Sequence, residues 1–208
     1  MGRPRNQNGR REQLVHSALD AIRDRGVANL RIRDVAESAQ VSTGTVHYHF
    51  TDIDELLYAV HSSASDRFFA ARMESIGEIA DAREQLRSMI YSGLPDSVDD
   101  KVVVAMYEID LYRRGDPAHA LLGQALFDRQ VALYFGILQL GVSQGHFTLN
   151  APALAIAQNL VALEDAYGMH IIYGNRSLSI VHCQYLLGTF AATATACAGI
   201  VPDTTDPA

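Results

Sequence analysis

The chain has 208 residues, of which 48% are hydrophobic and 20% are charged, and this composition excludes disordered and fibrous proteins. Its formal net charge is −7, but the charge is unevenly divided. Residues 1–50 carry eight Arg and five acidic residues, whereas the rest of the chain is strongly acidic. This asymmetry indicates a basic N-terminal segment that contacts an anionic partner and an acidic body with another role.

Helix signals follow one another along the whole chain, without an alternating strand pattern or an internal repeat. The first four predicted helices cover about residues 10–25, 32–38, 43–49 and 52–76. The next five cover about residues 80–92, 98–114, 117–145, 152–174 and 177–201, the last capped by Ser177. The clearest start is Asp116-Pro117, where an N-cap precedes Pro at the first helical position. The sequence therefore predicts an all-α protein of nine helices.

Residues 32–50 have the organisation of a helix-turn-helix: a short helix, a turn and a second short helix with its own N-cap. The second helix is rich in hydroxyl and imidazole groups and has a glycine that permits close approach to a duplex, as a major-groove reader requires. The arginines that precede it form a basic arm suited to the DNA backbone or minor groove. The residues expected to bind DNA are Arg3, Arg5, Arg11, Arg33, Ser42, Thr43, Gly44, Thr45, His47 and Tyr48.

So short a polar helix has a second interpretation, a solvated connector between longer helices, and basic termini are common. The two capped short helices, the positive charge and the amphipathic helix that follows them together favour double-stranded DNA as the partner.

Residues 10–60 resemble the DNA-binding domain of the TetR family of bacterial transcriptional regulators. The resemblance is carried by LRIRDVA at 30–36, by VSTGTVHYHF at 41–50 and by Leu56-Leu57 at the start of the fourth helix. It implies an N-terminal three-helix helix-turn-helix domain and a C-terminal helical domain for ligand binding and dimerisation. The corresponding expected domains are residues 1–51 and 52–201, with a disordered tail at 202–208.

The resemblance also implies roles for single residues. Thr45 and His47 are expected to face bases or backbone, Tyr48 to contact phosphate, and Phe50 to pack inward. Three positions depart from the family pattern. Arg31 removes a side-chain cap from the second helix, Gln40 replaces a turn glycine at a cost of about 1 kcal/mol, and Ile53 removes a phosphate contact.

A small-molecule effector in the body is the next implication of the resemblance. Glu164 and Asp165 are the only formal charges between residues 130 and 175, and Glu164 lies on an apolar helix face. An apolar site with aromatic walls and carboxylates favours a cationic ligand such as an amine. The expected effector-binding residues are Tyr107, Glu108, Leu111, Glu164, Tyr167 and His170. The alternative is a structural ion pair of Glu164 with Arg113, Arg114 or Arg129.

The last two predicted helices offer the best dimerisation surface, with Val181, Tyr185, Leu186 and Phe190 as its expected contacts. A two-fold homodimer places two recognition helices roughly 34 Å apart and so predicts a palindromic operator. We expect a cytoplasmic repressor that a small molecule releases from this operator.

Other functional classes have weaker support. Residues 141–145 match G-x-S-x-G, but on the last turn of a predicted helix instead of between a strand and a helix, so no enzyme is expected. The sequence shows no metal-ligand spacing and no cofactor motif. Residues 177–202 lack charge, yet their polar content favours burial in protein over a membrane anchor. A non-regulatory all-α protein that binds small molecules or cations is the remaining alternative.

Overall fold

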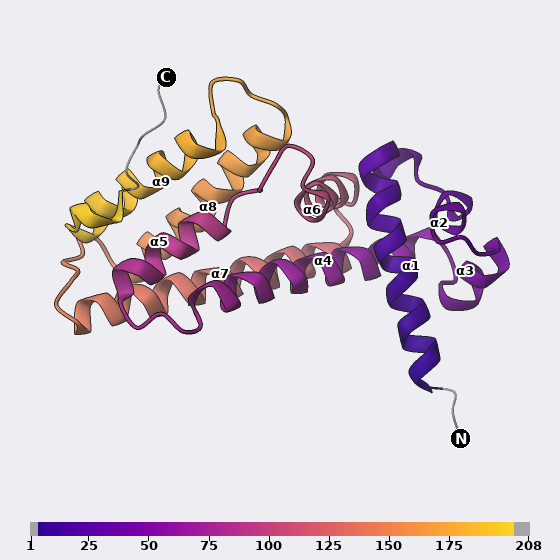
Figure 1. Cartoon of the computed structure of the whole chain (residues 1–208), viewed down its shortest axis with the longest axis horizontal. Helices are drawn as coiled ribbons and strands as arrows, with labels where there is room; N and C mark the ends of the chain where they lie inside the picture. Colours follow the sequence, from indigo (N-terminus) through magenta and orange to yellow (C-terminus); the bar gives the residue numbers. More distant parts are fainter. Residues whose placement is uncertain (1–3, 202–208) are drawn as a thin grey trace. The chain divides into compact units, whose positions relative to one another are not determined.

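The computed structural model describes residues 4–201, with side chains described from Gly9 onward. Within these residues the chain forms nine α-helices, two short 3-10 helices and no strand, which confirms the predicted all-α class (Figure 1). The α-helices are α1 (Pro4–Arg25), α2 (Ile32–Ser38), α3 (Thr43–His49), α4 (Ile53–Ile76), α5 (Ala82–Ser92), α6 (Lys101–Tyr112), α7 (Pro117–Ser143), α8 (Ala153–Ile172) and α9 (Ile180–Thr195).

The predicted bounds of α2 and α3 agree with the structure, but those of α9 were wrong at both ends. Ser179, and not Ser177, is its N-cap, because the Ser179 side chain accepts a hydrogen bond from the backbone N–H of His182 at 3.2 Å. The helix ends early because Ala196 adopts the left-handed conformation, with φ of 52°.

Contacts divide the described chain into two compact units. Unit 1 comprises the residues up to Arg67 together with Lys101–Gln124, and unit 2 comprises Phe68–Asp100 and the residues from Ala125 onward. The divisions therefore fall within α4 and α7. The helix α6 belongs to unit 1, where it packs against α1.

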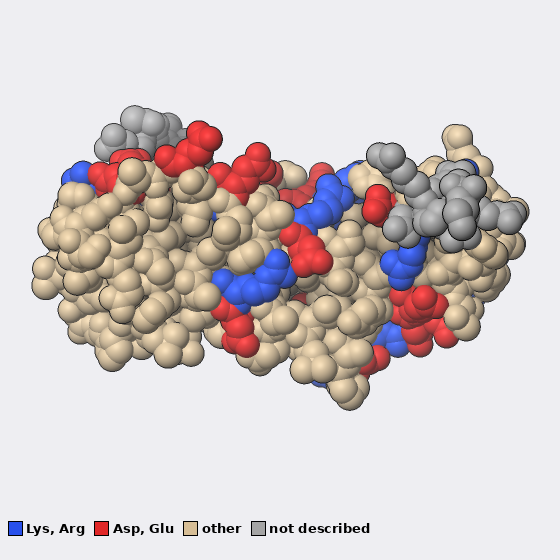
Figure 2. Space-filling model, turned by 90° about the horizontal axis from the view of Figure 1, so that it is seen from below, with Lys and Arg blue, Asp and Glu red and all other residues tan. Residues whose placement is uncertain are grey.

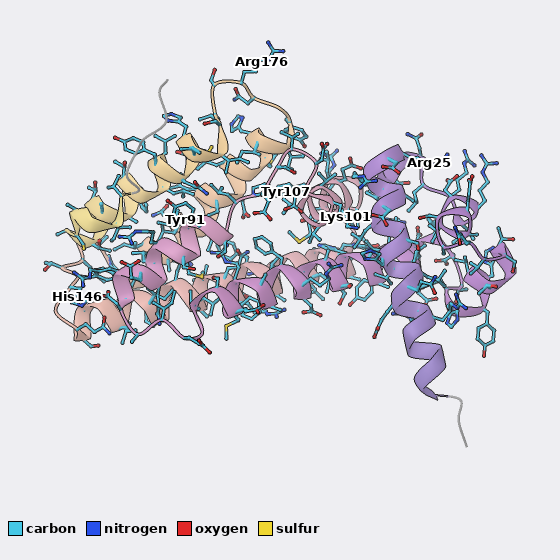
Figure 3. The ribbon with its side chains drawn as sticks, in the orientation of Figure 1. Arg25, Tyr91, Lys101, Tyr107, His146 and Arg176 are labelled. Atoms are coloured by element: carbon cyan, nitrogen blue, oxygen red, sulfur yellow. The ribbon has the colours of Figure 1, made fainter. Side chains whose placement is uncertain are left out.

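Unit 1 contains the helix-turn-helix, and α1 packs against both α2 and α6. Leu14, Ala18 and Ile22 form the expected buried stripe of α1. From α6, the Glu108 carboxylate accepts a hydrogen bond from the backbone N–H of Val27 at 2.7 Å, just after α1 ends. Lys101 at the start of α6 lies beside α1 and pairs with Asp20 at 2.8 Å (Figure 3). These contacts hold α1 along its second half.

The turn between α2 and α3 contains the predicted left-handed residue. Gln40 has φ of 55°, and two hydrogen bonds close the turn, from Val41 N–H to Ala36 C=O at 2.9 Å and from Gln40 N–H to Glu37 C=O at 3.1 Å. This pattern is a Schellman motif, which usually has Gly at the left-handed position. The strain expected from the sequence is therefore present in the fold.

Unit 1 also buries two histidines that are far apart in sequence. The Nδ1 atoms of His61 on α4 and His119 on α7 are 3.1 Å apart, and the rings stack. The Nε2 atom of His61 is 3.3 Å from Asp110, and burial raises the pKa of that carboxyl group to about 6, which favours its neutral form. Burial lowers the pKa of His61 to about 4, and the neighbouring His119 adds to this effect.

Unit 2 is organised around one apolar core, to which α5, α7, α8 and α9 contribute. Tyr134, Leu138, Leu160, Cys183 and Leu187 are among its fully buried members. No helix in the described part of the chain combines the length and the apolar character needed to span a bilayer.

Replacing Gln40 with Gly should raise the free energy of unfolding by roughly 0.5–1 kcal/mol, because Gly adopts the left-handed conformation without strain. The Gln40 side chain is exposed, so its removal alone should cost little. Denaturant unfolding would measure the gain. Gln40→Ala, which keeps a Cβ atom, is the control and should not share it.

Acidification should destabilise the protein through His61. In the unfolded chain this imidazole takes up a proton below its ordinary pKa of 6.5, whereas in the folded chain it does so only near pH 4. From His61 alone, lowering the pH from 6.5 to 4 should therefore reduce the free energy of unfolding by roughly 2–3 kcal/mol. Asp110 acts in the opposite direction, because burial raises its pKa to about 6, so that the folded chain takes up this proton before the unfolded chain does. The loss should be smaller in His61→Gln, and an unchanged pH dependence in that variant would refute the assignment.

Candidate functional site

The exposed face of α3 carries four of the ten residues that the sequence assigned to DNA binding. Val46 and Phe50 are fully buried and fix this short helix to unit 1, which confirms the inward packing of Phe50. On the opposite face Thr43, Gly44 and His47 are exposed, and Tyr48 is 72% exposed. A helix that is apolar on one side and presents hydroxyl, imidazole and phenol groups on the other can place those groups against a nucleic acid.

Two of the predicted residues organise the start of α3. The Ser42 hydroxyl accepts a hydrogen bond from the backbone N–H of Thr45 at 3.1 Å and lies 3.0 Å from the Thr45 hydroxyl. Ser42 is therefore the N-cap, and Thr45 is half-buried beside it. Ser42 and Thr45 therefore orient the first turn of α3.

The predicted arginines differ in how freely they face solvent. Arg33 is exposed on α2, and its Nε atom is 3.8 Å from Asp34. Arg11 lies over the Phe50 ring at 4.7 Å and near Glu55 at 4.0 Å, so it also braces the domain. Arg3 and the side chain of Arg5 lie outside the described residues.

The sequence did not identify Arg25, at the end of α1, as part of this region. Its guanidinium lies 3.4 Å from Asp34 and 3.8 Å from Glu37, both on α2. The Asp34 carboxylate also accepts a hydrogen bond from the backbone N–H of Arg31 at 2.9 Å. Asp34 therefore caps α2 from inside its first turn and compensates for the cap that Arg31 does not supply.

The predicted effector-binding residues fall into two groups that belong to different units. Tyr107, Glu108 and Leu111 lie on α6 in unit 1, where Glu108 bonds to Val27 and Leu111 is 64% exposed. The other three lie on α8 in unit 2. Of these, Tyr167 packs against the core, His170 is exposed and bonded to Asn175, and Glu164 is buried.

Glu164 forms a buried ion pair, but with a partner that the sequence did not indicate. The Arg72 guanidinium of α4 donates to both of its carboxylate oxygens, at 2.8 and 3.1 Å, and both side chains are essentially inaccessible. The predicted partners were wrong. Arg113 pairs with Asp54, Arg129 lies over the Phe69 ring, and Arg114 is exposed. The available signal was the i, i+4 spacing that puts Arg72 on one helix face with Phe68 and Ile76.

The charges of this pair affect each other's ionisation. Desolvation disfavours the charged guanidinium, but the adjacent carboxylate outweighs this and raises the pKa of Arg72. Burial raises the pKa of Glu164, and Arg72 and Tyr134 restrain that rise. Burial also raises the pKa of Tyr134, so its hydroxyl group stays protonated. This hydroxyl group donates a hydrogen bond to the Glu164 carboxylate. Gln130 accepts a further hydrogen bond from Arg72 at 2.9 Å.

Gly93, at the end of α5, leaves room for the pair. A Cβ atom built on Gly93 would overlap the Glu164 carboxylate and come within 2.6 Å of an Arg72 nitrogen. The backbone of Gly93 has an ordinary φ of −86°, so the constraint comes from this close approach and not from its conformation.

Gly93→Ala should therefore lower the free energy of unfolding by about 1–3 kcal/mol, because the new methyl group pushes the paired charges apart. Gly136→Ala is the matched control. Gly136 lies in α7 with no atom near its Cβ position, so alanine there should stabilise the helix by up to about 1 kcal/mol. Equal effects of the two substitutions in thermal or denaturant unfolding would contradict this account.

Comparison with known proteins supports a single family. The family model described as bacterial regulatory proteins, tetR family, matches residues 14–60. The HTH-type nicotine-responsive transcriptional repressor HdnoR of Paenarthrobacter nicotinovorans is 28% identical over 123 residues, or 57% of this chain and 61% of that protein. The alignment thus spans less than two thirds of the relative. The HTH-type transcriptional repressor KstR2 of Mycolicibacterium smegmatis is 23% identical over 144 residues, covering 69% and 70% of the two chains.

A solved structure extends the similarity to most of the fold. It is that of a transcriptional regulator from Saccharomonospora viridis in complex with choline, with a TM-score of 0.83 and 25% identity. The structural alignment covers 90% of this chain and 98% of that regulator. The helix-turn-helix region, residues 14–60, therefore matches the bacterial regulatory proteins of the tetR family, and the described fold is similar over most of its length to that of a solved transcriptional regulator.

Proposed function

We propose that this chain is a transcriptional repressor that binds duplex DNA by laying α3 in the major groove. The observation that supports this most directly is the two-sided character of α3, with buried Val46 and Phe50 on one side and exposed Thr43, His47 and Tyr48 on the other. His47 and Thr43 offer groups for base edges, and Tyr48 offers a hydroxyl for phosphate. Arg33 adds an exposed positive charge on α2, the other helix of the helix-turn-helix.

We further propose that the repressor binds a palindromic operator as a homodimer formed through α8 and α9. Figure 2 shows unit 2, at its left, from the side of α4 and α7, and this face carries few charged side chains, whereas α8 and α9 lie toward the far side. On α8, Leu154, Met169 and Tyr173 just beyond its end are exposed, and on α9 Val181 is exposed. Tyr185, Leu186 and Phe190 are half-buried. These uncharged helix faces suit an isologous contact, and two-fold symmetry of the protein matches two-fold symmetry of the site.

Gly44→Ala is the sharpest test of DNA binding. In the free protein the added methyl group would meet only the Ser42 hydroxyl, at 3.6 Å, so the fold should keep or slightly gain stability. If Gly44 faces the duplex, the same methyl group should weaken DNA binding by about tenfold or more, because the helix can no longer approach closely. Electrophoretic mobility shift with a palindromic duplex selected from a random pool would measure the affinity.

Gly136→Ala in α7 provides the control for the substitution itself, and it should bind the duplex as the unchanged protein does. Binding should also weaken steeply with salt, as phosphate contacts require. Unaltered affinity of Gly44→Ala would exclude α3 as the recognition helix.

We also propose that an organic cation releases the repressor from its operator. The regulator from Saccharomonospora viridis binds choline, which is a quaternary ammonium ion, and HdnoR is named for its response to nicotine, which is an amine. Within unit 2, aromatic rings and the buried carboxylate of Glu164 form the kind of environment that such ligands require. Release of the labelled duplex in a titration with amines would test this proposal directly.

A further inference from the structure

The guanidinium of Arg72 lies in surroundings that would equally bind a small organic cation. The Phe68 ring centre is 5.6 Å from its central carbon and the Tyr134 ring centre is 5.4 Å away. The Glu164 carboxylate accepts two hydrogen bonds from it. Two aromatic rings and a carboxylate around one positive charge are the features by which proteins recognise ammonium and guanidinium ligands.

Arg72 does not satisfy all of its hydrogen-bond donors at this position. Its terminal nitrogens bond to Glu164, Gln130 and the backbone carbonyl of Met89. Its Nε atom, although buried, has no partner among the described residues. A buried donor without a hydrogen-bond partner is destabilising, so replacing the guanidinium by another cation carries a reduced net cost.

The same side chain anchors the second half of α4. Between residues 66 and 76, all of which the structure describes, Arg72 is the one fully buried residue. Ala71 and Met73 on either side of it are exposed, and Ile76 is only partly buried against the core. An arginine on a helix near solvent can extend its charged end into water when it leaves a buried site. Removing the guanidinium would therefore loosen the final turns of α4.

We propose that Arg72 is an internal occupant of a cation site formed by Phe68, Tyr134 and Glu164, and that the effector is an ammonium or guanidinium compound that replaces it. The inference rests on the proposed function and identifies the residues and the regulation of its effector site. A one-for-one exchange keeps Glu164 paired throughout, whereas loss of Arg72 without replacement would leave a buried carboxylate alone. Release of Arg72 frees α4, the helix that follows the helix-turn-helix.

Arg72→Met empties the site while keeping Glu164 and most of the side-chain volume. In isothermal titration calorimetry and thermal unfolding of the full chain, methylguanidinium and choline should bind this variant about tenfold or more tightly than the unchanged protein, and should raise its unfolding temperature. The uncharged analogue of choline, in which carbon replaces the ammonium nitrogen, should have no such effect. If Arg72→Met does not fold, Arg72→Lys replaces it in the same titrations. Lysine keeps a positive charge at the site but loses the bidentate hydrogen bond to Glu164, so the added cations should displace it more readily than they displace arginine.

The matched control is the double variant Arg72→Met with Glu164→Gln. It removes both charges together, so it should fold without leaving a buried ion unpaired, and it should bind neither cation. Cation affinity that is equal in the unchanged protein and in the emptied variant, or that persists in the double variant, would overturn the proposal.

Operator binding separates this inference from the proposed function. The double variant keeps every residue of the α3 surface, so it should still bind the duplex, but the cations should no longer release it. Duplex binding without any cation binding would leave the repressor standing and refute the exchange at Arg72. If the cations bind as expected but neither the unchanged protein nor any variant binds the duplex, the exchange at Arg72 stands and the proposed repressor is refuted.

Discussion

The ion pair between Arg72 and Glu164 is the constraint on which the structure of unit 2 depends. Neither charge can be buried alone, because the desolvation penalty of an unpaired ion exceeds the favourable interactions that an apolar core offers it. Each therefore requires the other, and the pair requires Tyr134 and Gln130 to complete its hydrogen bonds. Three helices, α4, α7 and α8, must meet at one point for this to happen.

The requirement extends to residues that carry no charge. Gly93 has to be a glycine because its Cα atom lies against the carboxylate. Phe68 and Tyr134 have to be aromatic for the guanidinium to be held from the sides as well as from the end. Such a cluster is specific in its geometry, yet it contributes little net stability. That combination suits a site where one cation can exchange for another.

Unit 1 is built on the opposite principle, with its polar groups outside and its apolar groups inside. Val46 and Phe50 hold α3 in place, and the polar side of the helix is left exposed. The buried pair of His61 and His119 departs from this arrangement, as does buried Asp34, and both imidazoles favour the neutral form because burial lowers their pKa values. Glu108 and Lys101 of α6 contact Val27 and Asp20, so the unit that contains the helix-turn-helix includes a helix distant from it in the sequence.

The sequence by itself determined the order of the α-helices, the position of the helix-turn-helix and the strained turn at Gln40, although not the bounds of α9, because caps, glycines and hydrophobic periodicity act within a few residues. It also indicated that Glu164 was unusual, since a lone acidic pair in an apolar stretch needs an explanation. It could not identify Arg72 as the partner, 92 residues away, nor join His61 to His119, 58 residues apart. Any arginine in the chain could have satisfied the carboxylate. Only the packing of α4, α7 and α8 decided which one did, because an ion pair forms between groups that the fold brings together, however far apart they lie in the chain.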